Sequence, residues 1–436
     1  MMEIVSYKAE AHCNALQRIK SRSLQLNPEL VTRVAEIVDA VRAGGDEALI
    51  HFTFEYDRVK LRPSDIRVPN EAIEAAGRKA PAVTVDAFRR AIGNVRAFHN
   101  RQAERGWTIQ GESGSELGLR VLPIPSAGLY VPGGSAAYPS SLIMNAIPAQ
   151  VAGVGRIAVT TPPRNLEGSP AIAAILGELG IREVYQVGGA QAIAALAFGT
   201  ESIPRVDKIV GPGNLYVAIA KKLVYGSVGI DSIAGPTEIV VLADESASPA
   251  FIAADLLAQA EHDREASAVC ITPSAKLGRE VAREVERRLA GLDRNQIAGA
   301  SLERYGAIFI VGSLKEGCDL VNLIAPEHLE LMTANNDETL QWIENAGAIF
   351  FGDWSSEPVG DYLAGPNHVL PTLGTSRFSS PLGVYDFVKR QSIIRYSREA
   401  LIDNASLISA MADAEGLTAH KQAVMERVMN DKRDEG

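Results

Sequence analysis

The central part of the chain alternates between two kinds of apolar pattern. Between residues 128 and 243, short runs rich in β-branched residues are separated by longer stretches whose apolar positions recur with helical spacing. The short runs are Gly128–Val131, Arg156–Thr161, Glu183–Val187, Lys208–Val210 and Ile239–Ala243. Strands that alternate with helices of about 10–15 residues are typical of βαβ units, so this pattern predicts a parallel sheet.

The same alternation resumes after residue 250. A helix at 250–262 precedes a strand at Ala268–Thr272, and a helix follows at 275–290. Further strands are expected at Ala307–Val311 and Ala348–Phe351, with a helix between them. A second α/β unit is therefore predicted, and the fold class is α/β.

The two ends of the chain follow other patterns. Residues 1–24 are typical of a short polar helical arm, and the pattern from about 28 to 104 is helical. Leu117–Leu122 alternates as in a strand. The C-terminal tail predicts one helix at Glu399–Ala412 and another at Thr418–Met429.

Charge and composition exclude several classes of protein. The net charge is -10 with no block of basic residues, which argues against nucleic acid as a partner. The three cysteines are far apart and form no CxxC pair, as expected of reduced thiols in a cytoplasmic protein. The N-terminus has no apolar core, and no apolar run approaches the ~20 residues that span a bilayer. We therefore expect neither a signal peptide nor a membrane segment.

Glycine-rich turns are the candidates for a cofactor site. Gly153–Ala158 matches the GxGxxA string, but it follows a helix and precedes a strand, so we interpret it as a helix end. Tyr130–Gly134, Gly188–Gln191 and Gly211–Asn214 instead follow strands and open helices. Such turns admit a phosphate to backbone N–H groups. Each is also typical of an ordinary tight βα turn; three in one sheet favour a nucleotide.

The adjacent pair Glu327-His328 is the strongest candidate for proton transfer, because a carboxylate and an imidazole are the side chains best suited to move protons near neutral pH. The pair alone is also typical of a loop that caps backbone groups. Histidine is scarce, however, with seven in 436 residues, and the last four lie in short polar signatures. These signatures are Gln259–His262, Glu327-His328, Asn367-His368 and Thr418–His420. One catalytic cleft would account for all of them.

Gln259 and His262 are candidates for a metal site. They lie three residues apart on a predicted helix and share a face. Asp361 and His420 are the natural candidates to complete the site. Two imidazoles with oxygen ligands suit zinc, and manganese or cobalt is also possible. A Gln/His pair at this spacing is by itself more often part of a solvated helix face.

Together these motifs closely resemble the histidinol dehydrogenase family, over nearly the whole chain. The runs that carry the resemblance are Gly128–Gly134, Tyr138–Ala149, Val187–Ala197, Gly211–Asn214, Ala234–Glu238, Gln259–His262, Ala325–Glu330, Asn367–Thr372, Phe378–Gly383 and Glu415–His420. Departures are few: Thr237 replaces a serine of other members and keeps its hydroxyl, and Pro366 stands where some members have threonine.

The resemblance implies an NAD-dependent enzyme of histidine biosynthesis that oxidises L-histidinol through L-histidinal to L-histidine, with one zinc ion per subunit. It implies that Glu327 and His328 are the catalytic acid/base pair. The implied zinc ligands are Gln259, His262, Asp361 and His420. The implied substrate-binding residues are Thr237, Gln259, His262, His328, Asp361, Glu415 and His420. The implied NAD-contacting residues are Tyr130, Gln191 and Asn214.

Pattern and resemblance together give the expected architecture: two Rossmann-like parallel-sheet α/β domains with helical extensions at both ends, in an intertwined homodimer with shared active sites. The expected parts are an arm at 1–24, a domain with the metal and catalytic residues at 25–129 and 239–381, an NAD-contacting domain at 130–238, and a tail at 382–436 that reaches the partner.

Two other functions are compatible with parts of the sequence. A homologous zinc- and NAD-dependent dehydrogenase could oxidise another polar alcohol, such as a sulfonated diol. A non-catalytic NAD-binding protein is a different class, but the retained acid, base and metal positions argue against it.

Overall fold

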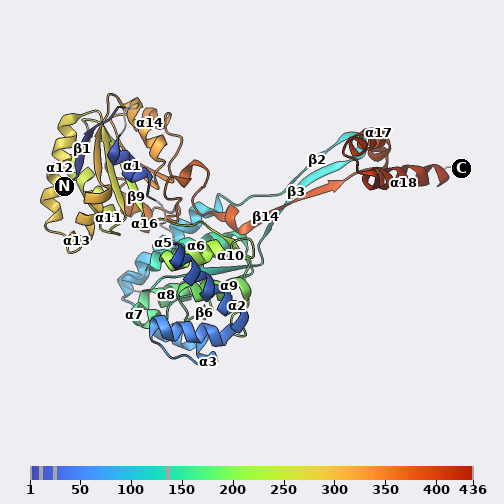
Figure 1. Cartoon of the computed structure of the whole chain (residues 1–436), viewed down its shortest axis with the longest axis horizontal. Helices are drawn as coiled ribbons and strands as arrows, with labels where there is room; N and C mark the ends of the chain where they lie inside the picture. The colour runs from blue at the N-terminus through green and yellow to red at the C-terminus, as the bar shows by residue number, and fades with distance from the viewer. Residues whose placement is uncertain (1, 9–12, 23–26, 134–137, 435–436) are drawn as a thin grey trace. The chain divides into compact units, whose positions relative to one another are not determined.

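The computed structural model describes residues 2–8, 13–22, 27–133 and 138–434. The chain divides into two compact units (Figure 1). Unit 1 comprises Met1–Gln102 and Ile124–Phe387, and unit 2 comprises Ala103–Pro123 and Val388–Gly436. Each unit is described by itself.

Unit 1 contains a five-stranded parallel sheet. Its strands, in spatial order, are β6 (Glu183–Tyr185), β5 (Arg156–Thr160), β4 (Ser126–Tyr130), β7 (Lys208–Val210) and β8 (Gly229–Ile230). The chain proceeds from β4 outward through β5 and β6, then returns to the other side of β4 for β7 and β8. The strand order therefore reverses between β4 and β7, which is where open α/β sheets form ligand crevices.

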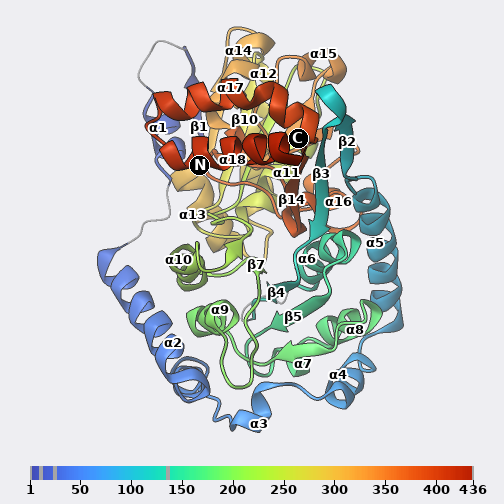
Figure 2. The ribbon, with the colours of Figure 1, turned by 90° about the vertical axis from the view of Figure 1, so that its right-hand side faces the viewer.

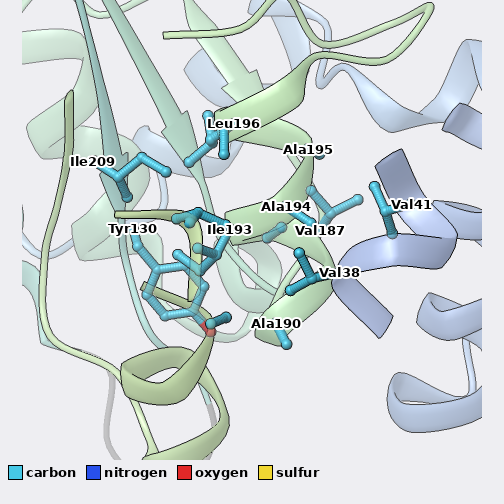
Figure 3. Close-up of a cluster of buried hydrophobic side chains, with 14 of the residues drawn as sticks. Val38, Val41, Tyr130, Val187, Ala190, Ile193, Ala194, Ala195, Leu196 and Ile209 are labelled. Atoms are coloured by element: carbon cyan, nitrogen blue, oxygen red, sulfur yellow. The ribbon is translucent and has the colours of Figure 1, made fainter. Parts of the chain in front are cut away.

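Helices cover both faces of this sheet (Figure 2). One face carries α2 (Pro28–Asp57), α9 (Gly189–Phe198) and α10 (Leu215–Val224), and the other carries α4 (Asn70–Gly77), α5 (Ala82–Asn100), α6 (Pro139–Ala152) and α8 (Pro170–Glu178). Side chains of β4 alternate between the two apolar cores: Leu129 packs on the α6 side and Tyr130 on the α9 side. Figure 3 shows Tyr130 beside Ile193 of α9, with Val38 of α2 against the same helix.

Unit 1 also contains a six-stranded parallel sheet. Its spatial order is β1 (Glu3–Ser6), β11 (Ala307–Ile310), β10 (Ser267–Thr272), β9 (Glu238–Ala243), β12 (His328–Met332) and β13 (Ala348–Phe351). The associated helices are α1 (Asn14–Lys20), α11 (Pro249–Ala260), α12 (Ala275–Leu289), α13 (Asn295–Tyr305), α14 (Leu314–Ile324) and α16 (Glu357–Tyr362). Here the strand order reverses between β9 and β12.

Unit 2 is an antiparallel ribbon followed by a helix pair. The strands, in spatial order, are β14 (Val388–Arg395), β3 (Glu116–Pro123) and β2 (Trp107–Gln110). Helices α17 (Arg398–Ala414) and α18 (Thr418–Asp434) pack on each other at one end of the ribbon (Figure 1). Trp107, Ile394 and Met411 are exposed in the single chain, at 54%, 74% and 68%.

The remaining elements are short. They are the helices α3 (Pro63–Ile66), α7 (Asn165–Gly168) and α15 (Asn336–Leu340), and the 3₁₀ turns η1 (Glu112–Gly114), η2 (Thr375–Arg377) and η3 (Val384–Phe387). Among the described residues, none of the helices combines the length and the apolar character needed to cross a membrane.

The predicted α/β fold class is confirmed, and every strand expected between 128 and 351 is present within a few residues of its expected bounds. Gly153 is confirmed as a helix end, since it follows α6 in the left-handed region with φ of 86°.

Five strands among the described residues were not expected: β1, β2, β8, β12 and β14. The segment 1–24, expected to be helical, begins with β1, because Ile4 and Val5 pair with β11 at the edge of the sheet. β12 was missed because His328 and Glu330 are polar, yet both are buried. β14 was missed because it is mostly polar and exposed, and it forms by pairing with β3.

A buried ion pair between Lys221 and Asp231 holds the turn that follows β7. Asp231 accepts a hydrogen bond from the Gly211 N–H group at 2.8 Å, and Lys221 donates one to the Gly211 carbonyl at 3.1 Å. Gly211 has φ of +120°, and a Cβ there would lie 2.2 Å from the carbonyl oxygen of Tyr130. The peptide of Gly211 is thus fixed on both sides, in a conformation that favours glycine.

We predict that Asp231→Asn lowers the free energy of unfolding by about 3–5 kcal/mol, because it leaves the buried Lys221 ammonium without its partner charge. Urea unfolding monitored by circular dichroism measures the change. Asp86→Asn removes an acid from an exposed pair with Arg89 and serves as the control, with little effect on the unfolding midpoint. Equal effects of the two substitutions would contradict the assigned role of burial.

Candidate active site

The topology of the six-stranded sheet gathers polar residues at its amino-terminal edge. Thr237 directly precedes β9, and Glu327 directly precedes β12, the two strands that flank the reversal in strand order. Helix α11 runs back from the carboxyl edge to the amino edge, so it brings Gln259 and His262 to the same place. His328 is the first residue of β12.

A directed chain of hydrogen bonds connects three of these residues. The Thr237 hydroxyl donates to Glu327 Oε2 at 2.5 Å, because an ionised carboxylate can only accept. The same hydroxyl therefore accepts from Gln259 Nε2, at 2.7 Å. This fixes the orientation of the Gln259 amide and leaves its buried Oε1 with no hydrogen-bond partner among the described residues. A buried oxygen without a donor suits a bound cation.

His328 is held in one tautomer. Its Nδ1 lies 3.1 Å from the carbonyl oxygen of Glu238, and a carbonyl can only accept, so Nδ1 carries the proton. In the neutral ring, Nε2 is then the unprotonated nitrogen and is available as a base. His328 lines a cavity of about 560 Å³, together with Phe350, Asp361 and His368.

Burial raises the pKa of Glu327 above its usual range, although His328 and the hydrogen bond from Thr237 act in the opposite direction. The Glu238 N–H group also donates to Glu327, at 3.0 Å. Arg22 forms a buried ion pair with Glu238 nearby, and burial lowers the pKa of Arg22 to about 10. Glu327 is therefore a more basic carboxylate than an exposed one, held in place by two donors.

A cluster of potential metal ligands lies within unit 1. One ligand atom from each of His262, Glu357 and Asp361 lies within 4.8 Å of the other two. Gln259, with its unpartnered Oε1, lies in the last turn of α11, and His262 lies in the turn that directly follows this helix. An imidazole, an amide oxygen and two carboxylates fit a divalent cation such as zinc or manganese.

His368 connects two elements around this cluster. Its Nδ1 lies 2.9 Å from the carbonyl oxygen of Asp361, and its Nε2 lies 3.4 Å from the Ser141 hydroxyl of α6. Burial lowers the pKa of His368, which favours the neutral ring. The sequence identified Asn367-His368 as a polar signature but did not include it among the site residues, and it did not identify Glu357 at all. The sequence feature that could have identified Glu357 is its position four residues before Asp361, a spacing that places both side chains on one face of a helix.

The candidate cofactor turns meet at the carboxyl edge of the five-stranded sheet. Tyr130 ends β4, and Gly211–Asn214 follows β7, so both flank the reversal in strand order. Tyr130 Oη accepts from the Gly189 N–H group at 3.1 Å, and burial raises the pKa of Tyr130 to about 12. The side chain of Gln191 lies against Gly189. Asn214 caps α10 by accepting from Val217, at 3.2 Å. Gly134 lies outside the described residues.

Glu415 and His420 belong to unit 2. Glu415 directly follows α17, and His420 lies in the first turn of α18. Both are exposed in the single chain.

Buried carboxyl groups line the contact between α11, β12 and α16. His328 and Glu330 face the same side of β12, because they are two residues apart in a strand. Burial and the neighbouring Asp255 raise the pKa of Glu330 to about 9. Burial also raises the pKa of Asp255 to about 6 and, with the charge of Asp361, that of Glu357 to about 9. Protons are therefore retained in this cluster at neutral pH.

Comparison with known proteins identifies the family to which the chain belongs. The sequence profile of histidinol dehydrogenase matches residues 20–428. The chain belongs to the histidinol dehydrogenase family. It is 53% identical over 400 residues to the histidinol dehydrogenase of Halalkalibacterium halodurans, covering 92% of this chain and 94% of that one. It is 54% identical over 396 residues to that of Geobacillus kaustophilus, covering 91% and 93%.

The fold agrees with this family. The crystal structure of histidinol dehydrogenase from Elizabethkingia anophelis matches with a TM-score of 0.92 and 35% identity, over 99% of both chains. The resemblance inferred from the sequence motifs is therefore confirmed, and the protein is an oxidoreductase of the histidinol dehydrogenase family.

We predict that Glu330→Gln stabilises the metal-free protein increasingly as the pH rises. Below the ordinary pKa of a carboxyl group, the folded and unfolded wild-type chains both hold the Glu330 proton. As the pH rises toward about 9, the unfolded chain releases this proton but the folded chain keeps it, so the wild type loses stability. The slope is at most about 1.4 kcal/mol per pH unit. Urea midpoints of both proteins at pH 5 and pH 8 measure it, and a difference independent of pH would contradict the assignment.

Proposed function

We propose that this protein is a zinc-containing, NAD-dependent histidinol dehydrogenase that oxidises L-histidinol to L-histidine in two steps through L-histidinal. The observation that carries the proposal is the juxtaposition, in a chain of this family, of the Thr237–Glu327 pair, His328 and the cluster of His262 with Asp361. An acid/base pair thus lies at the same sheet edge as a set of metal ligands.

His328 is the base of the first step. Oxidation of an alcohol removes the hydroxyl proton while hydride leaves for the nicotinamide. Because Nδ1 of His328 donates to Glu238, the free Nε2 takes this proton. A positioned base contributes roughly 10²–10⁴-fold to the rate.

Glu327 serves the second step, in which water adds to the aldehyde before the second hydride leaves. The raised pKa of Glu327 makes its carboxylate a better base for this water. Thr237 and the Glu238 N–H group both donate to Oε2, so the carboxylate stays in one orientation while its other oxygen accepts the proton.

Gln259, His262 and Asp361 of unit 1 and His420 of unit 2 would hold the zinc ion, which when bound would ligate the polar end of the substrate and so fix its position. Thr237, His328 and Glu415 complete the set of substrate-contacting residues. Positioning of this kind keeps the reactive aldehyde in place between the steps. It also excludes simple alcohols, which leave the polar groups of the site unpaired.

NAD would bind at the carboxyl edge of the five-stranded sheet, at the reversal between β4 and β7. Tyr130 and Gln191 shape the turn at Gly189, and Asn214 opens α10. In this assignment residues 130–238 form the NAD-contacting domain, and residues 25–129 with 239–381 form the domain that carries the metal and the acid/base pair.

The proposal includes a cytoplasmic homodimer with shared active sites, in which the tail 382–436 contributes Glu415 and His420 to the partner subunit. Exposed Trp107, Ile394 and Met411 in unit 2 support an interface, since large apolar side chains gathered on a small unit mark contact surfaces.

We expect the purified protein with zinc to form two NADH for each L-histidinol consumed. Exhaustive chelation should abolish turnover, and added zinc should restore it. Absorbance at 340 nm measures both. A panel with a sulfonated diol tests the alternative: turnover of the diol with no turnover of histidinol would favour a homologue with another substrate. Full activity without metal would contradict the zinc requirement.

Subunit complementation tests the shared site. His328→Asn in unit 1 and His420→Asn in unit 2 should each be inactive alone. Mixed subunits should recover about a quarter of the wild-type activity, because half the dimers are mixed and each of these has one intact site. The experiment is a refolding of the two variants together, with activity measured against each variant refolded alone. No recovery in a mixture shown to contain mixed dimers would contradict shared sites.

A further inference from the structure

Helix α16 presents two carboxyl side chains to His262. Glu357 is its first residue and Asp361 its fifth, so both lie on one face of the helix. Their oxygens and a ring nitrogen of His262 lie within 4.8 Å of one another. Glu357 is only 2% exposed, which distinguishes it from the acidic groups that gather on protein surfaces without a ligand.

Glu330 fixes the start of this helix. Its Oε1 accepts a hydrogen bond from the N–H group of Glu357 at 2.9 Å. Glu330 is itself 1% exposed and lies two residues after His328 on the same face of β12. The position of Glu357 is therefore tied to the strand that carries the acid/base pair.

The acidic side chains around α16 suit a bound cation. Asp255, Glu330 and Glu357 are buried together, with Asp361 beside them. Across residues 2–8, 13–22, 27–133 and 138–434, no lysine or arginine forms an ion pair with any of these four. His368 Nδ1 lies 3.7 Å from Asp361 Oδ1, and the Asp361 side chain also shares a hydrogen bond with Glu357. Buried carboxylates are costly unless a proton or a cation offsets their charge, and a divalent cation offsets more than one of them at once. The unpartnered oxygen of Gln259 supplies independent evidence for a cation at this place.

We propose that Glu357 is a further residue of the metal centre, supplying a carboxylate oxygen beside His262 and Asp361, and that Glu330 is the residue that positions it. This inference rests on the proposed zinc-dependent function, because it concerns the same ion. The carboxylate of Glu357 adds negative charge at the metal and raises its affinity for zinc. The hydrogen bond from Glu357 to Glu330 holds α16 so that Glu357 and Asp361 face His262 together.

Zinc affinity of the metal-free protein tests the first part. Competition with a chromophoric chelator should show that Glu357→Gln weakens zinc binding by at least about tenfold. Glu261→Gln is the matched control, since it removes a nearby, partly exposed carboxylate that lies outside the cluster. Its effect should remain within about threefold, because charges that reach solvent are screened more strongly than buried ones. The visible spectrum of the cobalt-substituted protein should change with Glu357→Gln and not with Glu261→Gln.

The role of Glu330 is tested by a pair of substitutions at that position. Glu330→Gln keeps an oxygen that can accept from the Glu357 N–H group, so its zinc affinity should stay within about threefold of the wild type. Glu330→Leu keeps the volume and removes the acceptor, and it should weaken zinc binding about tenfold and alter the cobalt spectrum. Equal zinc affinities of the two variants would overturn the positioning role.

Asp361→Asn separates this inference from the proposed function. If Asp361→Asn weakens zinc binding while Glu357→Gln changes neither the affinity nor the cobalt spectrum, Glu357 is not part of the centre and the proposed function stands. If the wild-type protein itself binds no zinc, the proposed function fails. Circular dichroism and the unfolding midpoint establish that each variant is folded. If the Glu357→Gln protein is unfolded, Glu357→Asp is used in its place. The shorter side chain of aspartate withdraws the carboxylate from the ion, so the cobalt spectrum of Glu357→Asp should shift.

Discussion

The single hydroxyl proton of Thr237 determines the direction of the polar contacts in the active site. A threonine hydroxyl has one proton to give, and Glu327, as a carboxylate, can only receive it. Gln259 must then approach with its N–H₂ group, which turns its carbonyl oxygen toward a place with no protein donor. This hydroxyl therefore holds Glu327 in place as an acceptor and leaves the Oε1 atom of Gln259 as a candidate metal ligand. A serine at position 237 would offer the same single hydroxyl proton, so the threonine of this chain preserves these contacts.

The two sheets of unit 1 each reverse their strand order once, but they use opposite edges. In the five-stranded sheet the candidate cofactor turns follow the strands, at the carboxyl edge where such ligands usually bind. In the six-stranded sheet Thr237 and Glu327 precede the strands, at the amino edge. This arrangement is possible because α11 and α16 run back toward the amino edge of the sheet. Gln259, His262 and Asp361 lie at or just beyond the ends of these helices at that edge. The polar residues of β12 are tolerated in a buried strand because each has a partner: His328 donates to the carbonyl of Glu238 in β9, and Glu330 accepts from the N–H group of Glu357 in α16.

Most of the parallel strands could be predicted from the sequence, since a strand buried on both faces is a short apolar run with little ambiguity. The strand β12 could not, because a run with His328 and Glu330 gives no sign that its polar side chains meet Asp255 and the start of α16 inside the protein. Glu327-His328 was found because the two residues adjoin. Glu357 was missed because an acid in a six-residue helix resembles a surface turn, and only its packing shows that it is buried. The positions of Glu415 and His420 in a separate unit followed from family resemblance, not from local pattern.

The edge strand β1 has a consequence for how the chain acquires its structure during synthesis. Glu3 of β1 pairs with Ala307 of β11, so β1, which is made first, has no strand partner until β11 has been made. The five-stranded sheet, in contrast, is complete once Ile230 has emerged, and all its pairings lie between residues 126 and 230. It can therefore fold while the six-stranded sheet is still being translated, and domains released early do fold as units. The growing chain thus builds its candidate nucleotide site before the first residue of β9 exists, and its candidate acid/base and metal site only after Asp361 has been made.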